Sequence, residues 1–347
     1  MSVPLRIGRF RAYLEFVAAI LFFFVARSFA RHVAATLASD AWFPLIEQLL
    51  LVLLLVLGYA GFGSLFDRQS HSIAAQGLPS RPGWTGEAGL GLAVGWAAVI
   101  ACVLPMVVVG GIAIVISTQP SSWGWLLADI AFFGLAALAE EVAFRGYGFQ
   151  RFEVVVGPYG SAIGFALFYA IVQALQPGST NASVAVSVIF GLLLSMSYLR
   201  TRALWLSWGL NFAWKASRAL IFGLAVSGVT SHSSVVEGNP MGPFWVTGGG
   251  YGLDGSWISA MVLLMAFPVV YRVTRELDFR YNAPVIIPGG IAVDLEAAAR
   301  SQHEAATRTD DPGPAVPSLV QILPAAAPPS RAYPASETSS GSETSRS

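Results

Sequence analysis

Two adjacent carboxylates and an arginine follow a long apolar run between Gly124 and Leu138. These residues are Glu140, Glu141 and Arg145, and each charge at membrane depth costs ~2.5–3.5 kcal/mol on insertion scales. On a helix, Glu141 and Arg145 share a face and can pair, whereas Glu140 is turned about 100° away and is left for another partner. The pattern predicts a buried polar site in which the arginine holds one carboxylate while the other does chemistry. The alternative is a helix end whose charges reach the lipid headgroups.

Two further polar pairs have the same four-residue spacing within apolar segments. Tyr169 and Gln173 share one helix face, and Asn211 and Lys215 share another. Lys215 is the only lysine of the chain. A buried lysine needs a carboxylate partner or it loses its proton, so we expect Lys215 to meet Glu140 or the glutamate beside it. A purely architectural ion pair is the alternative to a functional one.

The composition predicts a protein with many membrane spans. Of its 347 residues, 55% are hydrophobic and only 12% are charged, whereas a soluble domain carries about 25% charged residues. The net charge of zero gives no electrostatic reason to expect nucleic-acid binding. The single cysteine, Cys102, excludes a disulfide framework and a cysteine zinc site. None of the four histidines lies in a clear apolar span, so no span offers a histidine base for a serine protease.

These residues must be positioned by membrane helices, since only helices or closed barrels satisfy their backbone in lipid. The sequence predicts an all-α polytopic bundle with N-terminal helices in 1–118, a core in 119–280 and a disordered tail in 281–347. Residues 228–255 are rich in glycine and are expected to form a flexible outer loop. The eight predicted spans are 12–30, 43–66, 88–116, 122–144, 157–176, 182–199, 203–227 and 256–273.

The arginines predict the orientation of these spans. Twelve arginines fall on the side of the N-terminus and only Arg27 and Arg31 fall near the other side, which is the asymmetry of the positive-inside rule. We therefore expect a multi-pass protein of the cell membrane with both termini in the cytoplasm. Glu140 then lies toward the cytoplasmic side, and Glu47 lies near the outer end of the second span, where it is expected to snorkel or pair. The twelve are Arg6, Arg9, Arg11, Arg68, Arg81, Arg145, Arg151, Arg200, Arg202, Arg272, Arg275 and Arg280.

The three polar groups together resemble the motifs of a known family. Glu140, Glu141 and Arg145 match a motif of two glutamates, three residues and an arginine. On these motifs the chain resembles the CAAX protease and bacteriocin-processing family, also called CPBP or Abi, which includes the type II prenyl-protein proteases. Tyr169 and Gln173 fall on the second motif, where the family has an aromatic residue and a histidine four residues later.

The third motif of the family is a histidine followed four residues later by asparagine, after a Leu-Trp pair. Here Leu204 and Trp205 precede Asn211 and Lys215, so asparagine replaces the histidine and lysine replaces the asparagine. Together with the stretch 247–252 before the last span, the resemblance covers residues 120–272.

The resemblance implies an intramembrane endopeptidase in which glutamates and histidines activate a water, with zinc as the cofactor to test. Both motif histidines are replaced here. Amide oxygens are weak ligands for zinc and cannot act as bases near neutral pH, and Lys215 repels a cation from the same place. The sequence therefore assigns no metal ligand and leaves the cofactor unknown.

Three hypotheses follow, and the resemblance favours the first. In an endopeptidase, Glu140 activates water, Arg145 holds Glu141, and Gln173 and Asn211 bind the substrate carbonyl or water beside Tyr169 and Lys215. Its partners are membrane lipid and a membrane-associated or prenylated peptide, not nucleic acid. In a catalytically inactive relative, Lys215 neutralises the glutamates, and the protein acts as a membrane binding or immunity-type protein. A small-solute transporter is the third hypothesis, since it also needs polar groups at depth.

The predicted orientation can be measured with reporter fusions. Fusions placed after Arg151 and after Arg202 should both report a cytoplasmic location, because each follows an inward-running span. A signal from outside the cytoplasm at either position would contradict the orientation and the count of eight spans.

Overall fold

The computed structural model describes residues 8–67, 72–117, 119–228, 231–233 and 235–282. The chain divides into two units, Met1–Ala283 and Pro284–Ser347, and all described residues belong to the first. The predicted disordered tail lies outside the described residues from position 283 onward. The predicted boundary between residues 118 and 119 stays a prediction.

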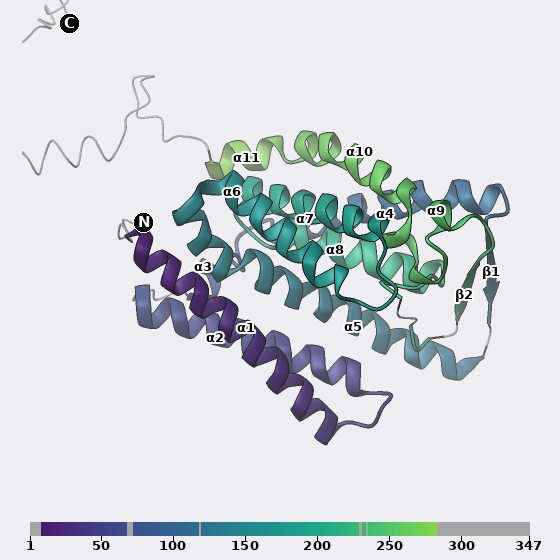
Figure 1. The fold of residues 1–347 in the computed structure, drawn as a ribbon, viewed down its shortest axis with the longest axis horizontal. Coiled ribbons are helices and arrows are strands. Elements are labelled where there is room, and N and C mark those ends of the chain that lie inside the picture. The colour runs from purple at the N-terminus through teal and green to yellow at the C-terminus, as the bar shows by residue number, and fades with distance from the viewer. Residues whose placement is uncertain (1–7, 68–71, 118, 229–230, 234, 283–347) are drawn as a thin grey trace, which may run out of the picture. The chain divides into compact units, whose positions relative to one another are not determined.

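The first unit is a bundle of long helices, as predicted (Figure 1). Helix α5 packs against α2, α6 and α8, and α4 packs against α8. Three short helices connect or follow the long ones: α3 (Ser72–Ala75), α9 (Phe244–Thr247) and α11 (Arg275–Asn282). The long helices are α1 (Arg9–Leu37), α2 (Phe43–Asp67), α4 (Trp84–Val108), α5 (Pro120–Arg145), α6 (Tyr147–Ala174), α7 (Asn181–Thr201), α8 (Trp205–Ala216) and α10 (Trp257–Val273).

Five helical segments in the described part of the chain are long and apolar enough to cross a membrane. They account for six of the eight predicted spans, because one segment of 53 residues, Ser122–Ala174, joins α5 and α6. For the last two predicted spans the structure has shorter helices. Helix α8 has 12 residues and continues as a π-helix over Ser217–Ile221, and α10 has 17 residues. The count of eight therefore stays a prediction.

The third predicted span, 88–116, is too long at its C-terminal end. Helix α4 ends at Val108, and Gly110 then adopts a left-handed φ of 75°. The β-branched run Ile112–Ile116 forms strand β1, which pairs antiparallel with β2 (Val236–Pro240). The expectation that every apolar segment is helical is wrong here, because two glycines stop the helix and β-branched residues favour the extended chain.

The glycine-rich segment 228–255 is also more structured than predicted. Apart from residues 229, 230 and 234, it forms β2, α9 and two 3₁₀ turns, Gly249–Tyr251 and Leu253–Gly255. At Gly252 the φ is 84°, and a side chain there would place its Cβ 1.9 Å from the Ala225 carbonyl oxygen. Glycine therefore allows close backbone packing here rather than flexibility.

Small residues bring α4 and α8 into close backbone contact. A Cβ added to Gly91 would lie 2.1 Å from the Leu206 carbonyl oxygen, and one added to Gly209 would lie 2.2 Å from the Ala88 carbonyl oxygen. Gly95 faces the same helix one turn further along. This contact fixes the position of α8 along α4. Helix α8 carries two of the predicted site residues.

Gly91→Val should lower the melting temperature of the detergent-solubilised protein clearly, because the α4 and α8 backbones would have to separate. Overpacking of this kind costs about 1–3 kcal/mol or more. Gly89→Val is the matched control, since a Cβ at Gly89 meets no atom within 4 Å. Equal melting temperatures for the two variants would contradict the close contact.

Candidate active site

The last turn of α5 holds a buried ion pair. Arg145 Nη1 lies 3.1 Å from Glu141 Oε1, and both side chains are fully buried. Arg145 Nη2 also donates a hydrogen bond of 3.3 Å to the Gly191 carbonyl oxygen on α7. The predicted pairing of Glu141 with Arg145 is confirmed, and the arginine ties α5 to α7.

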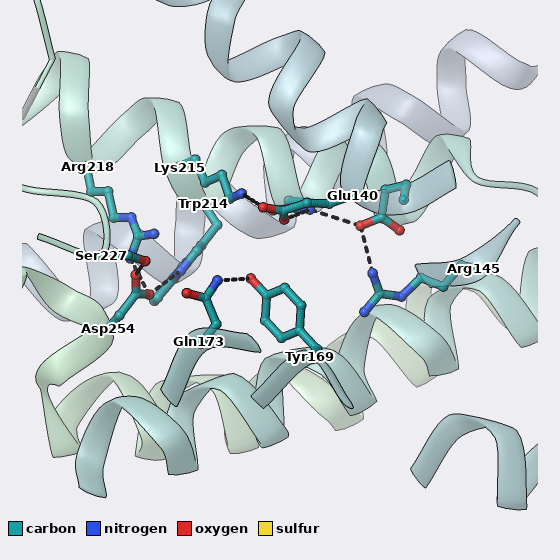
Figure 2. Close-up of polar contacts among 11 residues, drawn as sticks. Glu140, Arg145, Tyr169, Gln173, Trp214, Lys215, Arg218, Ser227 and Asp254 are labelled. Carbon is teal, nitrogen blue, oxygen red and sulfur yellow. Dashed lines mark hydrogen bonds and ion pairs between the residues drawn. The ribbon is translucent and has the colours of Figure 1, made fainter. Parts of the chain in front are cut away.

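Glu140 faces a different set of partners, all on α8 (Figure 2). Lys215 Nζ pairs with Glu140 Oε1. Asn211 Nδ2 lies 3.1 Å from Glu140 Oε2 and 3.0 Å from Glu141 Oε1, so one amide group bridges the two carboxylates. The predicted contact between Lys215 and a glutamate is confirmed. With all four side chains ionised, the two cations, Arg145 and Lys215, balance the two carboxylates, and the group has no net charge.

The third predicted pair, on α6, lies opposite this group across the same cavity. Gln173 Nε2 donates a hydrogen bond of 3.2 Å to the Tyr169 hydroxyl oxygen. Both side chains line the cavity, as do Glu140 and Lys215. The fold thus brings the motif positions of α5, α6 and α8 together.

The cavity has a volume of about 340 Å³, within the range of small ligand pockets. It lies between α1, α2, α5, α6, the end of α8 and the described residues Val226, Ser227, Ser231 and His232. Glu140 lines it with a quarter of its side chain exposed, whereas Glu141, Arg145 and Asn211 lie behind its wall. Its lining residues are Phe23, Arg27, Pro44, Glu47, Gln48, Leu51, Asp129, Phe132, Phe133, Ala136, Ala139, Glu140, Phe144, Tyr169, Val172, Gln173, Gln176, Lys215, Val226, Ser227, Ser231 and His232.

A family model described as type II CAAX prenyl endopeptidase Rce1-like matches residues 122–217. This segment is Rce1-like. The resemblance inferred from the sequence is thereby confirmed over residues 122–217, and all seven predicted site residues lie inside the match, whereas its extension to residue 272 stays a prediction. Over these residues the chain is similar to a family of CAAX prenyl endopeptidases. No curated protein and no solved structure matches the chain.

A buried carboxylate that no sequence motif indicates lies outside the Rce1-like segment. Asp254 accepts hydrogen bonds from Trp214 Nε1 at 3.2 Å and from the Ser227 hydroxyl at 2.9 Å, and it pairs with Arg218. Burial acts to raise the pKa of Asp254, but the Arg218 charge and these hydrogen bonds outweigh it and lower the pKa below its usual value. Trp214 and Lys215 are neighbours on α8, so Asp254 anchors the end of the helix that carries the lysine.

A second missed contact lies at the far end of the cavity. His232 Nδ1 is 3.1 Å from Asp129 Oδ1, and the Ser233 amide donates to Asp129 Oδ2 at 2.7 Å. His232 lies in no predicted span, so a pattern of polar residues within apolar segments does not indicate this contact. Glu47 lines the cavity half-buried and has no hydrogen bond or ion pair among the described residues, so its expected pairing is not seen.

The donor set does not fit a zinc ion. No group of three histidine, cysteine, aspartate or glutamate side chains that could hold a metal occurs among the described residues. Gln173 and Asn211 offer only neutral amide oxygens at the motif positions, and the Lys215 ammonium is already paired with Glu140. A dication there would meet a fixed positive charge at close range.

Arg145→Ala should destabilise the protein by ~3–5 kcal/mol, because it leaves the Glu141 carboxylate buried without its cation. Arg202→Ala is the control, since Arg202 forms an exposed pair with Glu153 and such pairs contribute about 0–1 kcal/mol. Thermal or denaturant unfolding of both variants in detergent measures the difference. An unchanged stability of Arg145→Ala would mean that the pair contributes no more than a surface contact.

Proposed function

We propose that this chain is a CAAX-protease-like intramembrane endopeptidase in which Glu140 activates the attacking water. The observation that carries the proposal is that the two adjacent glutamates have different surroundings. Glu141 is fully buried and held by Arg145, whereas Glu140 faces a cavity large enough for a peptide segment. The Rce1-like match over residues 122–217 supports the same reaction class.

Glu140 acts as general base and then as general acid. A carboxylate has about four lone-pair sites, and Lys215 and Asn211 each use one, on different oxygens of Glu140. A water bound at a remaining site gives its proton to Glu140 while its oxygen bonds to the carbonyl carbon of the peptide. Glu140 then passes this proton to the leaving nitrogen as the C–N bond breaks, so the products are an amine and a carboxylic acid, which loses its remaining proton to water.

Lys215 stabilises the negative charge that develops on the carbonyl oxygen. Its ammonium group lies at the cavity wall beside Glu140, and a fixed cation in a poorly solvated site favours an oxyanion without reorganisation. Asn211 lies outside the cavity lining, and its amide group holds the two glutamate side chains in place through a hydrogen bond to each. Tyr169 and Gln173 bind the peptide backbone on the opposite side, where the Gln173 amide oxygen remains an acceptor.

The partners follow from the reaction and the composition. The substrate is a membrane-associated peptide, and the description of the family suggests prenylated peptides as the first class to assay. Lipid surrounds the helices, and the protein is a multi-pass protein of the cell membrane with both termini in the cytoplasm, as the arginines predict.

One observation favours a second candidate, a non-catalytic relative that binds a membrane partner. Lys215 pairs with Glu140, so the carboxylate expected to act as base is already neutralised. In this case the cavity binds a peptide without cleaving it. The two candidates differ only in whether the bond is broken, so the same peptides and variants separate them.

Glu140→Gln should reduce peptide cleavage ~10²–10⁴-fold, the usual contribution of a general base. The assay uses purified protein in liposomes, a pool of prenylated and unprenylated peptides, and mass spectrometry of the products. Glu153→Gln is the control, because Glu153 pairs with Arg202 away from the cavity. Chelators should leave the rate unchanged, since the donor set does not fit zinc.

Two outcomes would contradict this proposal. Peptide binding without cleavage, equal in the native protein and in Glu140→Gln, would favour the non-catalytic relative. Cleavage that chelators abolish and zinc restores would contradict the step in which Glu140 and Lys215 act without a metal.

A further inference from the structure

The cavity extends from Glu140 toward one end of the bundle only. On α5 it runs back from Glu140 to Asp129, and on α6 it runs forward from Tyr169 to Gln176 just beyond the helix end. On α2 it is lined by the first turns, from Pro44 to Leu51. These parts lie at the same end of the bundle as the α1–α2 connection and the loop that carries His232.

Aromatic rings close the opposite end of the cavity. Phe144 lies one turn beyond Glu140 on α5 and is buried. Its ring centroid is 5.3 Å from that of Tyr169, in an edge-to-face contact, and 6.2 Å from that of Phe23. These three side chains form a floor between Glu140 and the end of the bundle at which α1 begins. At the other end the lining residues Arg27 and His232 are exposed, and a peptide would reach Glu140 from this open end.

The open end is polar. Arg27 and Glu47 line it without a hydrogen bond or ion pair in the part of the chain that the structure describes, and Asp129 and His232 line it as a pair. Charged groups in a membrane protein usually face a water-filled cavity. The same path can therefore supply the water that hydrolysis needs.

The charge distribution places this open end outside the cytoplasm. Arg27, Arg31 and Arg218 lie near it, the last of them paired with Asp254, while the other end of the bundle carries eight described arginines. The eight are Arg9, Arg11, Arg81, Arg151, Arg200, Arg202, Arg272 and Arg275.

The length of the cavity sets the length of the segment that fits it. Asp129 and Glu140 are eleven positions apart on α5, which is a rise of about 16 Å at 1.5 Å per residue. An extended chain covers this distance with about five residues, at roughly 3.3 Å each. Lined mainly by apolar and amide side chains, the cavity suits a short extended segment rather than a folded domain.

We infer that the substrate is a peptide segment, extended over about five residues, that enters from the extracytoplasmic side. This inference rests on the proposed function for the cleavage itself. The substrate class is then a secreted or membrane-anchored chain exposed outside the cytoplasm and not a cytoplasmic C-terminal tail, so in the assay above the prenylated peptides serve as the contrasting class. Such a segment would reach Glu140 past Asp129 and His232.

Cysteine accessibility in intact cells tests the entry side. The single native cysteine, Cys102, is buried, so the native chain serves as the unreactive background. Gln48→Cys and Gln176→Cys report on the cavity, Met241→Cys reports on the exposed outer segment, and Arg275→Cys on the exposed opposite end. The probe is a membrane-impermeant maleimide, applied before and after permeabilisation.

Before permeabilisation, Gln48→Cys and Met241→Cys should be labelled and Arg275→Cys should not. Labelling of Gln48→Cys and Gln176→Cys only after permeabilisation, or not at all, would overturn the entry side. So would Arg275→Cys labelled in intact cells. Gln176→Cys replaces Gln48→Cys if that variant does not fold. Because no cleavage is measured, this result is independent of whether Glu140→Gln loses activity.

Discussion

Charge neutrality within an apolar bundle is the constraint on which the rest of the structure depends. Two carboxylates on adjacent positions of α5 cannot both remain charged at this depth without two cations, and α5 itself supplies only Arg145. The second cation, Lys215, comes from α8, and Asn211 on the same helix bridges both glutamates. The position of α8 against α5 is thus set by electrostatics as well as by packing.

The sequence predicts this charged group well, because one of its ion pairs lies within a single helix and the other uses the single lysine of the chain. The pairing of Glu141 with Arg145 follows from four-residue spacing on one helix, and Lys215 is the only lysine. Asp254 and His232 could not be found in the same way. Their partners are 36 and 103 residues away, and both lie in a segment whose glycines suggested flexibility. Strand β1 was missed because an apolar β-branched run at the end of a helix has no periodicity of its own.

The replaced motif positions change what the site can do. Where the resemblance expects histidines, the chain has amides that neither take up a proton near neutral pH nor bind zinc well. Lysine adds the charge that a metal would otherwise bring. In the proposed mechanism the site relies on one carboxylate, Glu140, and one ammonium, Lys215, and the end of the helix that carries Lys215 is anchored through Asp254.

The close contact between α4 and α8 bears on whether the Rce1-like part of the chain can fold on its own. The Rce1-like match begins at residue 122, after α4 has ended at Val108. Yet the glycine face of α8 packs against the α4 backbone, in a contact to which Gly91 of α4 and Gly209 of α8 both contribute. Residues 122–217 on their own would leave this narrow face open to lipid. The segment that carries the chemistry is therefore not an independent folding unit, and a minimal version of this protein has to begin before α4.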